Sequence, residues 1–252
     1  MAQVRLRFHG VLNDFITPAL RGADIVHVFE RKASVKDMIE SFHVPHTEVE
    51  WMFAQGVAID FEHIVVDQEV IDVYPAINGR NFPVSVQLRL ALALPLTFIV
   101  DSNLGRLARY LRLLGFDCLY SNHFDDSEVA EIVRNQRRIV LTRDRALLQR
   151  KIITYGYYLR SDAPKLQTIE VLRRYDLFSS IKPFVRCTHC NGILREVAKQ
   201  SIEHRLEPLT KAHFDTFLMC ETCHRIYWEG SHCSRMEHLV ETFRANKLES
   251  GK

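Results

Sequence analysis

The chain has 252 residues, of which 47% are hydrophobic and 25% charged, with ten glycines and eight prolines. This composition excludes the disordered and fibrous classes, and the length allows two domains with a further small module. The net charge of +2 is uneven along the chain. Residues 1–96 carry eight basic and twelve acidic side chains, a net charge of −4, whereas residues 97–182 carry fifteen and ten, a net charge of +5. The basic middle region suits an anionic partner such as nucleic acid, and a solvated arginine-rich helix face is the alternative.

Targeting signals are not evident in the sequence. The first residues, MAQVRLRFHG, contain no apolar run followed by a cleavage site, and the most apolar window, residues 90–100, is short and broken by Pro95. We therefore expect a cytoplasmic protein with no membrane partner. Four of the six cysteines form two Cys-x-x-Cys pairs. In a cytoplasmic chain, this spacing indicates a metal site rather than disulfides.

The first elements in chain order predict a small mixed domain. Apolar residues alternate strictly over residues 3–8, and a second strand over residues 25–29 completes a hairpin. Ser34 is the expected N-cap of a helix whose apolar residues recur at helical spacing. Further short strands are expected near Trp51–Phe53, Gly56–Ile59 and Val70–Tyr74. This order is typical of a β-grasp, ubiquitin-like domain, which we place at residues 1–80.

The stretch from Val35 to Ala76 also resembles the ubiquitin-like relatives of small sulfur-carrier proteins. Such carriers end in a free Gly-Gly, whereas this chain runs on through Asn78-Gly79-Arg80. A carrier role needs a terminal carboxylate, so we expect a module for binding or packing instead. Residues 81–96 are the predicted linker to the next domain.

From Thr97 onward, strands and helices alternate. Strands are expected at 97–101, 118–120, 139–142 and 155–159, and helices at 103–114, 126–136, 144–151 and from about 164 to 175. Gly115 is the expected C-cap of the first helix, and Cys118 is expected in the core. Repeated βα units of this length predict an α/β domain with a parallel sheet flanked by helices, at residues 97–182.

A carboxylate follows each of these strands. Asp101 follows the first strand, Asp125 and Asp126 the second, Asp144 the third and Asp162 the fourth. Because the carboxyl ends of parallel strands share one edge of a sheet, these side chains are expected to gather there. Clustered carboxylates repel each other unless a hard cation such as Mg²⁺ or Mn²⁺ neutralises them. A metal held in this way can activate water against a phosphodiester.

Each acid also has a simpler interpretation as a helix N-cap. Asp126 and Asp144 both stand where a helix begins, and Glu128 shares the central position with Asp125 and Asp126. At Asp101, a neighbouring Ser102 or Asn103 can cap the helix and leave the carboxylate to a metal. Four arginines near the same edge can bind phosphate oxygens, although surface arginines are commonly only solvated. These arginines are Arg106, Arg109, Arg143 and Arg145.

The two cysteine pairs predict a zinc ribbon. Four thiolates in two knuckles suit tetrahedral Zn²⁺, and Gly192 lets the chain turn back toward the metal. Cys233, His189, His224 and His232 lie nearby, so a histidine in the ligand set stays an alternative. A closed four-thiolate site would hold the fold together rather than catalyse. The expected ligands are Cys187, Cys190, Cys220 and Cys223, within a zinc ribbon and C-terminal helix at residues 183–252.

Several motifs now resemble one family. The segments FIVDSNLGRLARYLRLLGFDCLY, FDDSEVAEI, RRIVLTRDRALLQRK, RCTHCNGIL and CETCHRIYWEGSH occur in order over roughly residues 97–240. They are similar to the Mut-seven C-terminal ribonuclease family, a PIN-like nuclease group with a zinc ribbon. The N-terminal region resembles the ubiquitin-like domain that precedes this nuclease in many bacterial members. Ser102-Asn103-Leu104-Gly105 departs from the family's usual Met-Leu-Gly and leaves the acid before it intact.

The resemblance implies RNA cleavage that depends on a divalent metal, with Asp101, the Asp125-Asp126 pair and Asp144 in the acidic positions. We therefore expect an Mg²⁺- or Mn²⁺-dependent ribonuclease with a structural Zn²⁺, acting on RNA, and a protein partner for the ubiquitin-like domain. The alternative is a non-catalytic RNA-binding or adaptor protein whose acids are only caps. A phosphohydrolase of the aspartyl-phosphate type ranks last, because Asn103 stands where such enzymes carry a second aspartate.

Overall fold

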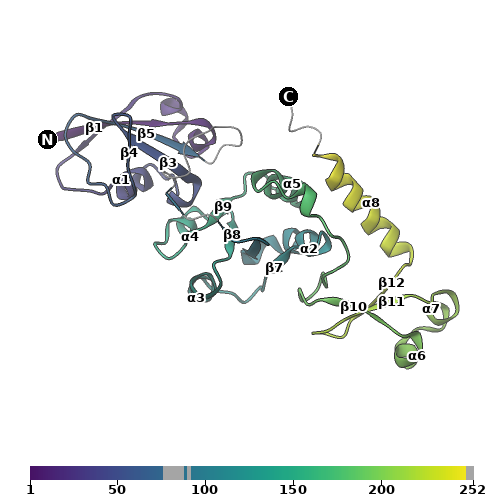
Figure 1. The fold of residues 1–252 in the computed structure, drawn as a ribbon. Coiled ribbons are helices and arrows are strands. Elements are labelled where there is room, and N and C mark those ends of the chain that lie inside the picture. The colour runs from purple at the N-terminus through teal and green to yellow at the C-terminus, as the bar shows by residue number, and fades with distance from the viewer. Residues whose placement is uncertain (76–87, 90–91, 248–252) are drawn as a thin grey trace. The chain divides into compact units, whose positions relative to one another are not determined.

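A computed structural model describes residues 1–75, 88–89 and 92–247 of the chain (Figure 1). The chain forms two compact units. The first unit comprises Met1–Leu94 and Asp126–Tyr158, and the second comprises Pro95–Asp125 and Leu159–Lys252. Most of the predicted linker, residues 81–87 and 90–91, lies outside the described residues. Among the described helices, none is long and apolar enough to cross a membrane.

The N-terminal part of the first unit is a five-stranded mixed sheet with the strand order β2-β1-β5-β3-β4. Strand β1 pairs antiparallel with β2 and parallel with β5, which confirms the predicted hairpin and the ubiquitin-like fold. The side chains of β5 alternate between buried and half-buried positions, as expected for a strand with one face on the core. The strands are β1 (Ala2–Phe8), β2 (Ile25–Phe29), β3 (Val49–Ala54), β4 (Val57–Ala58) and β5 (Glu69–Pro75).

One helix, α1 (Val35–Ser41), covers the core of this sheet. Its N-cap is Ser34, as predicted, and the Ser34 hydroxyl oxygen accepts a hydrogen bond from the Asp37 backbone N–H at 3.2 Å. Apolar side chains from the strands and from α1, including Leu6, Ile39 and Ile71, are fully buried together. Three short 3-10 helices connect the elements: η1 (Gly10–Asp14), η2 (Pro18–Leu20) and η3 (His46–Glu48).

The rest of the first unit continues as alternating helices and strands. Strands β8 and β9 run parallel, with Val140 opposite Gly156 and Thr142 opposite Tyr158. All four residues of β8 are buried, which is typical of a strand covered on both faces. These elements are α3 (Asp126–Gln136), β8 (Ile139–Thr142), α4 (Arg145–Gln149) and β9 (Gly156–Tyr158).

The ubiquitin-like fold packs onto β9 and α4 within the first unit. The buried His46 ring lies 2.6 Å from a carboxylate oxygen of Glu40 and 2.9 Å from the backbone oxygen of Ile153. The carboxylate of Glu48, also buried, accepts a hydrogen bond from the Tyr158 N–H at 2.6 Å. A second N–H···O contact joins Gln149 to the Glu40 carbonyl oxygen at 3.2 Å. The N-terminal domain is therefore built into this unit by buried polar contacts.

The second unit contains the other two strands of the α/β region, β6 (Thr97–Val100) and β7 (Asp117–Leu119), which also run parallel. Helix α2 (Gly105–Leu113) connects them and packs on α5 (Pro164–Arg174) (Figure 1). Gly115 follows α2 with a φ of +94°, the left-handed conformation that a C-terminal glycine permits, as predicted. Parallel strands flanked by helices confirm the α/β fold class, and Cys118 is buried in the core as expected.

The C-terminal part of the second unit is a small antiparallel sheet and a long helix. The strand order is β10-β11-β12. The predicted C-terminal helix is present as α8, whose Phe243 is fully buried with its ring 5.6 Å from that of Tyr110 in α2. The elements are η5 (Ser102–Leu104), η6 (Phe178–Ser180), β10 (Leu194–Val197), α6 (Lys199–Ile202), η7 (Glu203–Arg205), α7 (Pro208–His213), β11 (Phe217–Cys220), β12 (Ile226–Trp228) and α8 (Ser231–Ala245).

Candidate functional site

Asp101 stands directly after β6, where the buried strand Thr97–Val100 ends. Its backbone occupies the N-cap position of η5, but its side chain forms no capping hydrogen bond with that short helix. The Ser102 hydroxyl donates to the Asp101 carboxylate at 3.2 Å. Helix α2 begins after Leu104, which has no side-chain cap, so the expectation that Ser102 or Asn103 caps this helix is wrong. The turn of 3-10 helix shifts the start of α2 to Gly105.

Asp144 follows β8 and acts as the N-cap of α4. Its Oδ1 atom accepts hydrogen bonds from the backbone N–H groups of Ala146 at 2.8 Å and Leu147 at 3.4 Å. Both bonds go to the same oxygen, and the residue is exposed. Asp144 is therefore a helix N-cap, as the simpler interpretation predicted. Its other carboxylate oxygen, Oδ2, is the one that would bind a metal.

The other three predicted acids belong to the loops and helix starts around these strands. Asp125 and Asp162 are exposed residues of the second unit. Asp126 is the first residue of α3 in the first unit, whereas an N-cap would directly precede the first helical residue. Its side chain lies outside the described part of the chain. Asp101, Asp125 and Asp162 thus belong to the second unit and Asp144 to the first. Their gathering around one metal stays a prediction.

The predicted arginines differ in their surroundings. Arg106 and Arg109 are exposed on α2 and line a pocket in the second unit. Arg143 is exposed on the loop before α4. The guanidinium of Arg145 lies 5.1 Å from the ring centre of Phe15 and 5.3 Å from that of Tyr158, within cation–π distance of both. The Arg145 side chain therefore also ties α4 to the ubiquitin-like fold.

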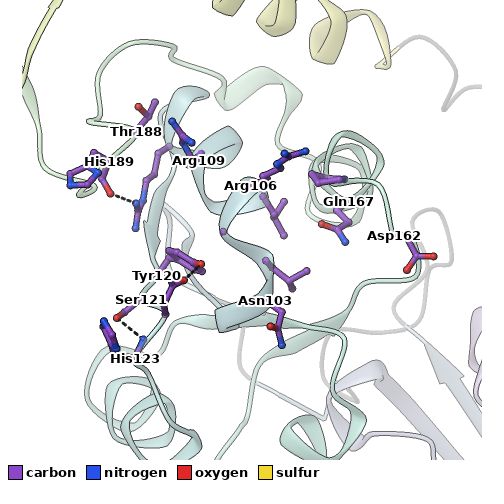
Figure 2. A pocket seen from close by; sticks show the side chains of 16 residues that line it. Asn103, Arg106, Arg109, Tyr120, Ser121, His123, Asp162, Gln167, Thr188 and His189 are labelled. Atoms are coloured by element: carbon purple, nitrogen blue, oxygen red, sulfur yellow. Dashed lines mark hydrogen bonds between the residues drawn. The ribbon is translucent and has the colours of Figure 1, made fainter.

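The pocket beside α2 has a volume of about 710 Å³, which lies within the usual range for small-molecule sites. Figure 2 shows Asp162 and Gln167 on one side of α2, and Thr188 and His189 of the first cysteine knuckle on the other. Residues 120–123, after β7, form a third wall. The pocket thus combines cationic, anionic and neutral polar side chains.

Some residues of this pocket were not among the predicted site residues. Gln167 is 98% buried in α5, where its Nε2 donates to the Ser161 carbonyl oxygen at 2.8 Å. A polar residue four positions before Val171, on the buried face of a predicted helix, was the signal that could have identified Gln167. Tyr120, His123 and His189 carried no comparable signal, because their convergence depends on how distant segments pack.

The four predicted cysteine ligands form one compact group. Their sulfur atoms all lie within 4.8 Å of one another, and the Cys187–Cys223 and Cys190–Cys220 sulfur pairs are 3.6 and 3.4 Å apart. A tetrahedral zinc with bonds of about 2.3 Å places its sulfur ligands roughly 3.8 Å apart, so these residues fit Zn²⁺. Among the described residues, the group contains cysteines alone, with no contribution from His189, His224 or Cys233.

Local hydrogen bonds lower the pKa of one of these thiols, that of Cys187. Burial acts to raise the pKa of Cys187, but hydrogen bonds from the Tyr227 hydroxyl and from the backbone of Cys190 and His189 lower it to about 7. The Tyr227 oxygen lies 3.0 Å from the Cys187 sulfur. Burial raises the pKa of Cys190 to about 12. Because metal ligands must be thiolates, binding at this site would release protons.

The second knuckle closes on Gly192. A side chain added at this glycine would meet the Cys220 sulfur at 2.8 Å and the Thr222 hydroxyl oxygen at 2.5 Å. The Gly192 carbonyl oxygen accepts a hydrogen bond from the Cys187 N–H at 2.7 Å. The close approach of Cys220 and Thr222 therefore leaves no room for a side chain at this position.

Hydrogen bonds of buried polar side chains join the first knuckle to α2 and β7. Arg112, only 3% exposed, donates from Nε to the Cys118 carbonyl oxygen at 2.8 Å and from Nη1 to the His189 carbonyl oxygen at 2.7 Å. Asn191 accepts a hydrogen bond from the Cys118 N–H at 3.0 Å and donates to Asp117 at 3.0 Å. The cysteine ribbon and the α/β strands of the second unit therefore form one body.

The fold and the cysteine group define a multidomain protein with an α/β domain, a ubiquitin-like domain and a four-cysteine cluster that could bind zinc. Residues 96–240 match the Mut7-C RNAse domain, and residues 1–81 match the Mut7-C ubiquitin domain. The first match covers more than half of the chain, so the protein belongs to the Mut7-C RNAse domain family, which confirms the resemblance seen in its motifs. Searches of curated proteins and of solved structures gave no match.

Proposed function

We propose that the protein is a divalent-metal-dependent ribonuclease that hydrolyses RNA phosphodiester bonds. The observation that carries the proposal is the setting of Asp101 inside the matched RNAse domain. This carboxylate follows a buried parallel strand and is not used to cap the helix after it. A carboxylate at the end of such a strand lies where open α/β sheets place their ligands.

In this proposal, Asp101, Asp144 and Asp162, with Asp125 or Asp126 between them in the chain, hold Mg²⁺ or Mn²⁺. Such an ion supplies an activated water and neutralises charge on the scissile phosphate when it is bound. Asp101 presents its carboxylate from the rigid end of β6. Asp144 offers its Oδ2 atom, because Oδ1 is engaged by the first turn of α4. These residues suit the proposed ions, because carboxylate oxygens are the ligands that Mg²⁺ and Mn²⁺ prefer.

The arginines are assigned to RNA binding. Arg106 and Arg109 lie three residues apart on α2, and both line the pocket beside this helix. Arg143 is exposed directly before Asp144. Arg145 would contribute positive charge while its side chain remains beside the rings of Phe15 and Tyr158. Guanidinium groups bind phosphate oxygens in pairs, so these residues would position the backbone of the RNA.

A structural Zn²⁺ is assigned to the four cysteines. The four sulfur atoms lie within 4.8 Å of one another, which supports a four-thiolate zinc site, and such a site would leave no ligand position for water or substrate. The proposed role of this zinc is to stabilise the ribbon, including Thr188 and His189, which line the pocket beside α2.

The experiment that tests the proposal is an RNA cleavage assay with the full chain. Wild-type protein is incubated with single-stranded RNA in Mn²⁺, in Mg²⁺ and without either ion. We expect cleavage in the presence of a divalent ion and a loss of at least about 100-fold in the Asp101→Asn and Asp144→Asn variants, since each change removes a metal ligand. Asp215→Asn, which changes an exposed carboxylate of the ribbon, is the matched control and should cleave like the wild type.

The alternative, a non-catalytic RNA-binding or adaptor protein, has one specific observation in its favour. Asp144 caps α4, as that alternative predicts for all of the acids. It predicts salt-dependent RNA binding with no cleavage in any ion. Cleavage that is equally strong in Asp101→Asn, in Asp144→Asn and in the wild type would refute the metal site.

A further inference from the structure

The pocket beside α2 lies wholly within the second unit, and its walls come from separate segments of that unit. Helix α2 supplies Arg106 and Arg109, helix α5 supplies Gln167, and the first cysteine knuckle supplies His189 (Figure 2). The knuckle wall is fixed by the buried Arg112, which donates to the backbone oxygen of His189. The wall of the pocket that contains His189 is therefore held in place by a buried hydrogen bond.

The charges of the pocket favour an anionic ligand. Arg106 and Arg109 are exposed, and within the described part of the chain neither forms an ion pair. Other arginines of the second unit are engaged in ion pairs: Arg186 pairs with Asp117 at 3.2 Å and Arg195 with Glu221 at 2.9 Å. The two guanidinium groups beside the pocket thus keep their donors available for phosphate oxygens.

A second and independent observation concerns Gln167. Its Oε1 atom is buried and has no hydrogen-bond partner among the described residues. The orientation of the amide is fixed, because its Nε2 donates to the Ser161 carbonyl oxygen. An unpaired buried acceptor costs free energy, and few such groups occur in native proteins. Because Gln167 lines the pocket and its amide points toward it (Figure 2), a donor for Oε1 can come from a ligand.

We propose that this pocket binds one nucleotide of single-stranded RNA, with its phosphate on Arg106 and Arg109 and its ribose 2′-hydroxyl donating to Oε1 of Gln167. Phosphate contacts position a nucleic acid without reading its sequence, whereas the 2′-hydroxyl is the group that distinguishes RNA from DNA. Gln167 is then the residue that selects RNA. This inference rests on the proposed function in one respect: RNA is the ligand in both.

The test measures affinity and not cleavage. Fluorescence anisotropy of the full chain is recorded with a labelled single-stranded RNA and with DNA of the same sequence, in a buffer without added Mg²⁺ or Mn²⁺ and without chelator, so that zinc stays bound. We expect the wild type to bind RNA about 3- to 10-fold more tightly than DNA, the value of one hydrogen bond. A third oligonucleotide with a 2′-O-methyl group at every position lacks the donor and should bind no more tightly than DNA.

The decisive variant is Gln167→Met, which keeps the length of the side chain and removes the acceptor. We expect it to lose the preference for RNA by weakening RNA binding alone, so that the RNA-to-DNA affinity ratio falls to about 1. Arg106→Ala should weaken RNA and DNA binding equally and reduce the salt slope by about 1. Arg5→Ala, which removes one charge from the ubiquitin-like domain, is the matched control and should leave both affinities unchanged.

Equal affinity of the wild type for RNA and DNA, or a preference for RNA that persists in Gln167→Met, would overturn the assignment. The wild-type comparison of the three oligonucleotides does not depend on the folding of any variant. Failure of the proposed function has a different signature: RNA preference and its loss in Gln167→Met would be intact while no metal ion produced cleavage. The two claims can therefore fail separately.

Discussion

Arg112 shows how one residue can join two parts of the second unit. Its guanidinium is buried and donates to the carbonyl oxygens of Cys118 and His189, one in the α/β strands and one in the cysteine knuckle. Hydrogen bonds from a charged donor are worth more than neutral ones, so the loss of both would cost stability. The side chain therefore stabilises the fold, in contrast to its exposed neighbours on α2.

We predict that Arg112→Met lowers the free energy of unfolding by about 2–4 kcal/mol, the value of two charged hydrogen bonds less the gain from burying an apolar side chain. Urea denaturation followed by circular dichroism measures this change. Arg109→Ala, one turn earlier on the same helix but exposed, is the matched control and should change stability by less than about 0.5 kcal/mol. Equal effects of the two substitutions would contradict the role given to Arg112.

The sequence could not separate these arginines. Arg106, Arg109 and Arg112 all belong to one arginine-rich segment, whose Leu107 and Leu111 are fully buried. The buried Arg112 donates to the carbonyl oxygen of His189, 77 residues away in the chain. Local periodicity in the sequence does not predict such a distant contact. The same holds for Gln167, whose polar character at a buried position was visible although its place in a pocket was not.

At the scale of elements, the sequence was most informative where a short motif carries its own geometry. Strands at 25–29 and 139–142 and the helix at 126–136 begin and end where they were expected. The Ser34 cap and Gly115 also took their predicted roles. The start of α2 differed, because residues 102–104 form a 3-10 turn that the apolar pattern does not distinguish from an α-helix.

The two cysteine knuckles form the element with the clearest metal chemistry. We predict about one zinc per chain in the purified protein, measured by inductively coupled plasma mass spectrometry, and its loss in Cys220→Ser, because three thiolates leave the tetrahedral site open. Acidification should also weaken zinc binding, since protons compete for thiolates. Cys233→Ser, a cysteine of α8 outside the cluster, is the matched control and should keep its zinc. Full zinc content in Cys220→Ser would show that the cluster is not the site.

At the scale of the whole molecule, the units do not follow the order of the chain. The ubiquitin-like domain forms one unit with residues 126–158, and contacts such as Glu48 to Tyr158 join residues 110 positions apart. The sequence predicted the ubiquitin-like domain and the α/β domain separately, and the limits assigned to them remain predictions. Nothing local indicated that His46 and Glu48 would be buried against β9 and α4.

This packing leads to a prediction for Glu48. Glu48→Ala removes the carboxylate that accepts from the Tyr158 N–H, so that amide should exchange with deuterium faster, by about 10-fold or more, in hydrogen-exchange mass spectrometry. Residues of α4 should lose protection with it. Glu62→Ala, an exposed carboxylate of the same domain, is the control and should leave exchange in β9 and α4 unchanged. Unaltered exchange at Tyr158 would mean that the domain is not held in place by this contact.

The central claim is that Asp101 and Asp144 bind the same divalent metal. The most direct measurement is anomalous diffraction from crystals of the full chain soaked in Mn²⁺. We predict a Mn²⁺ peak within about 2.0–2.3 Å of a carboxylate oxygen of each residue, and its loss in Asp101→Asn crystals. Anomalous density confined to the four cysteines, or carboxylates of Asp101 and Asp144 more than about 8 Å apart in crystals that bind Mn²⁺, would contradict the account.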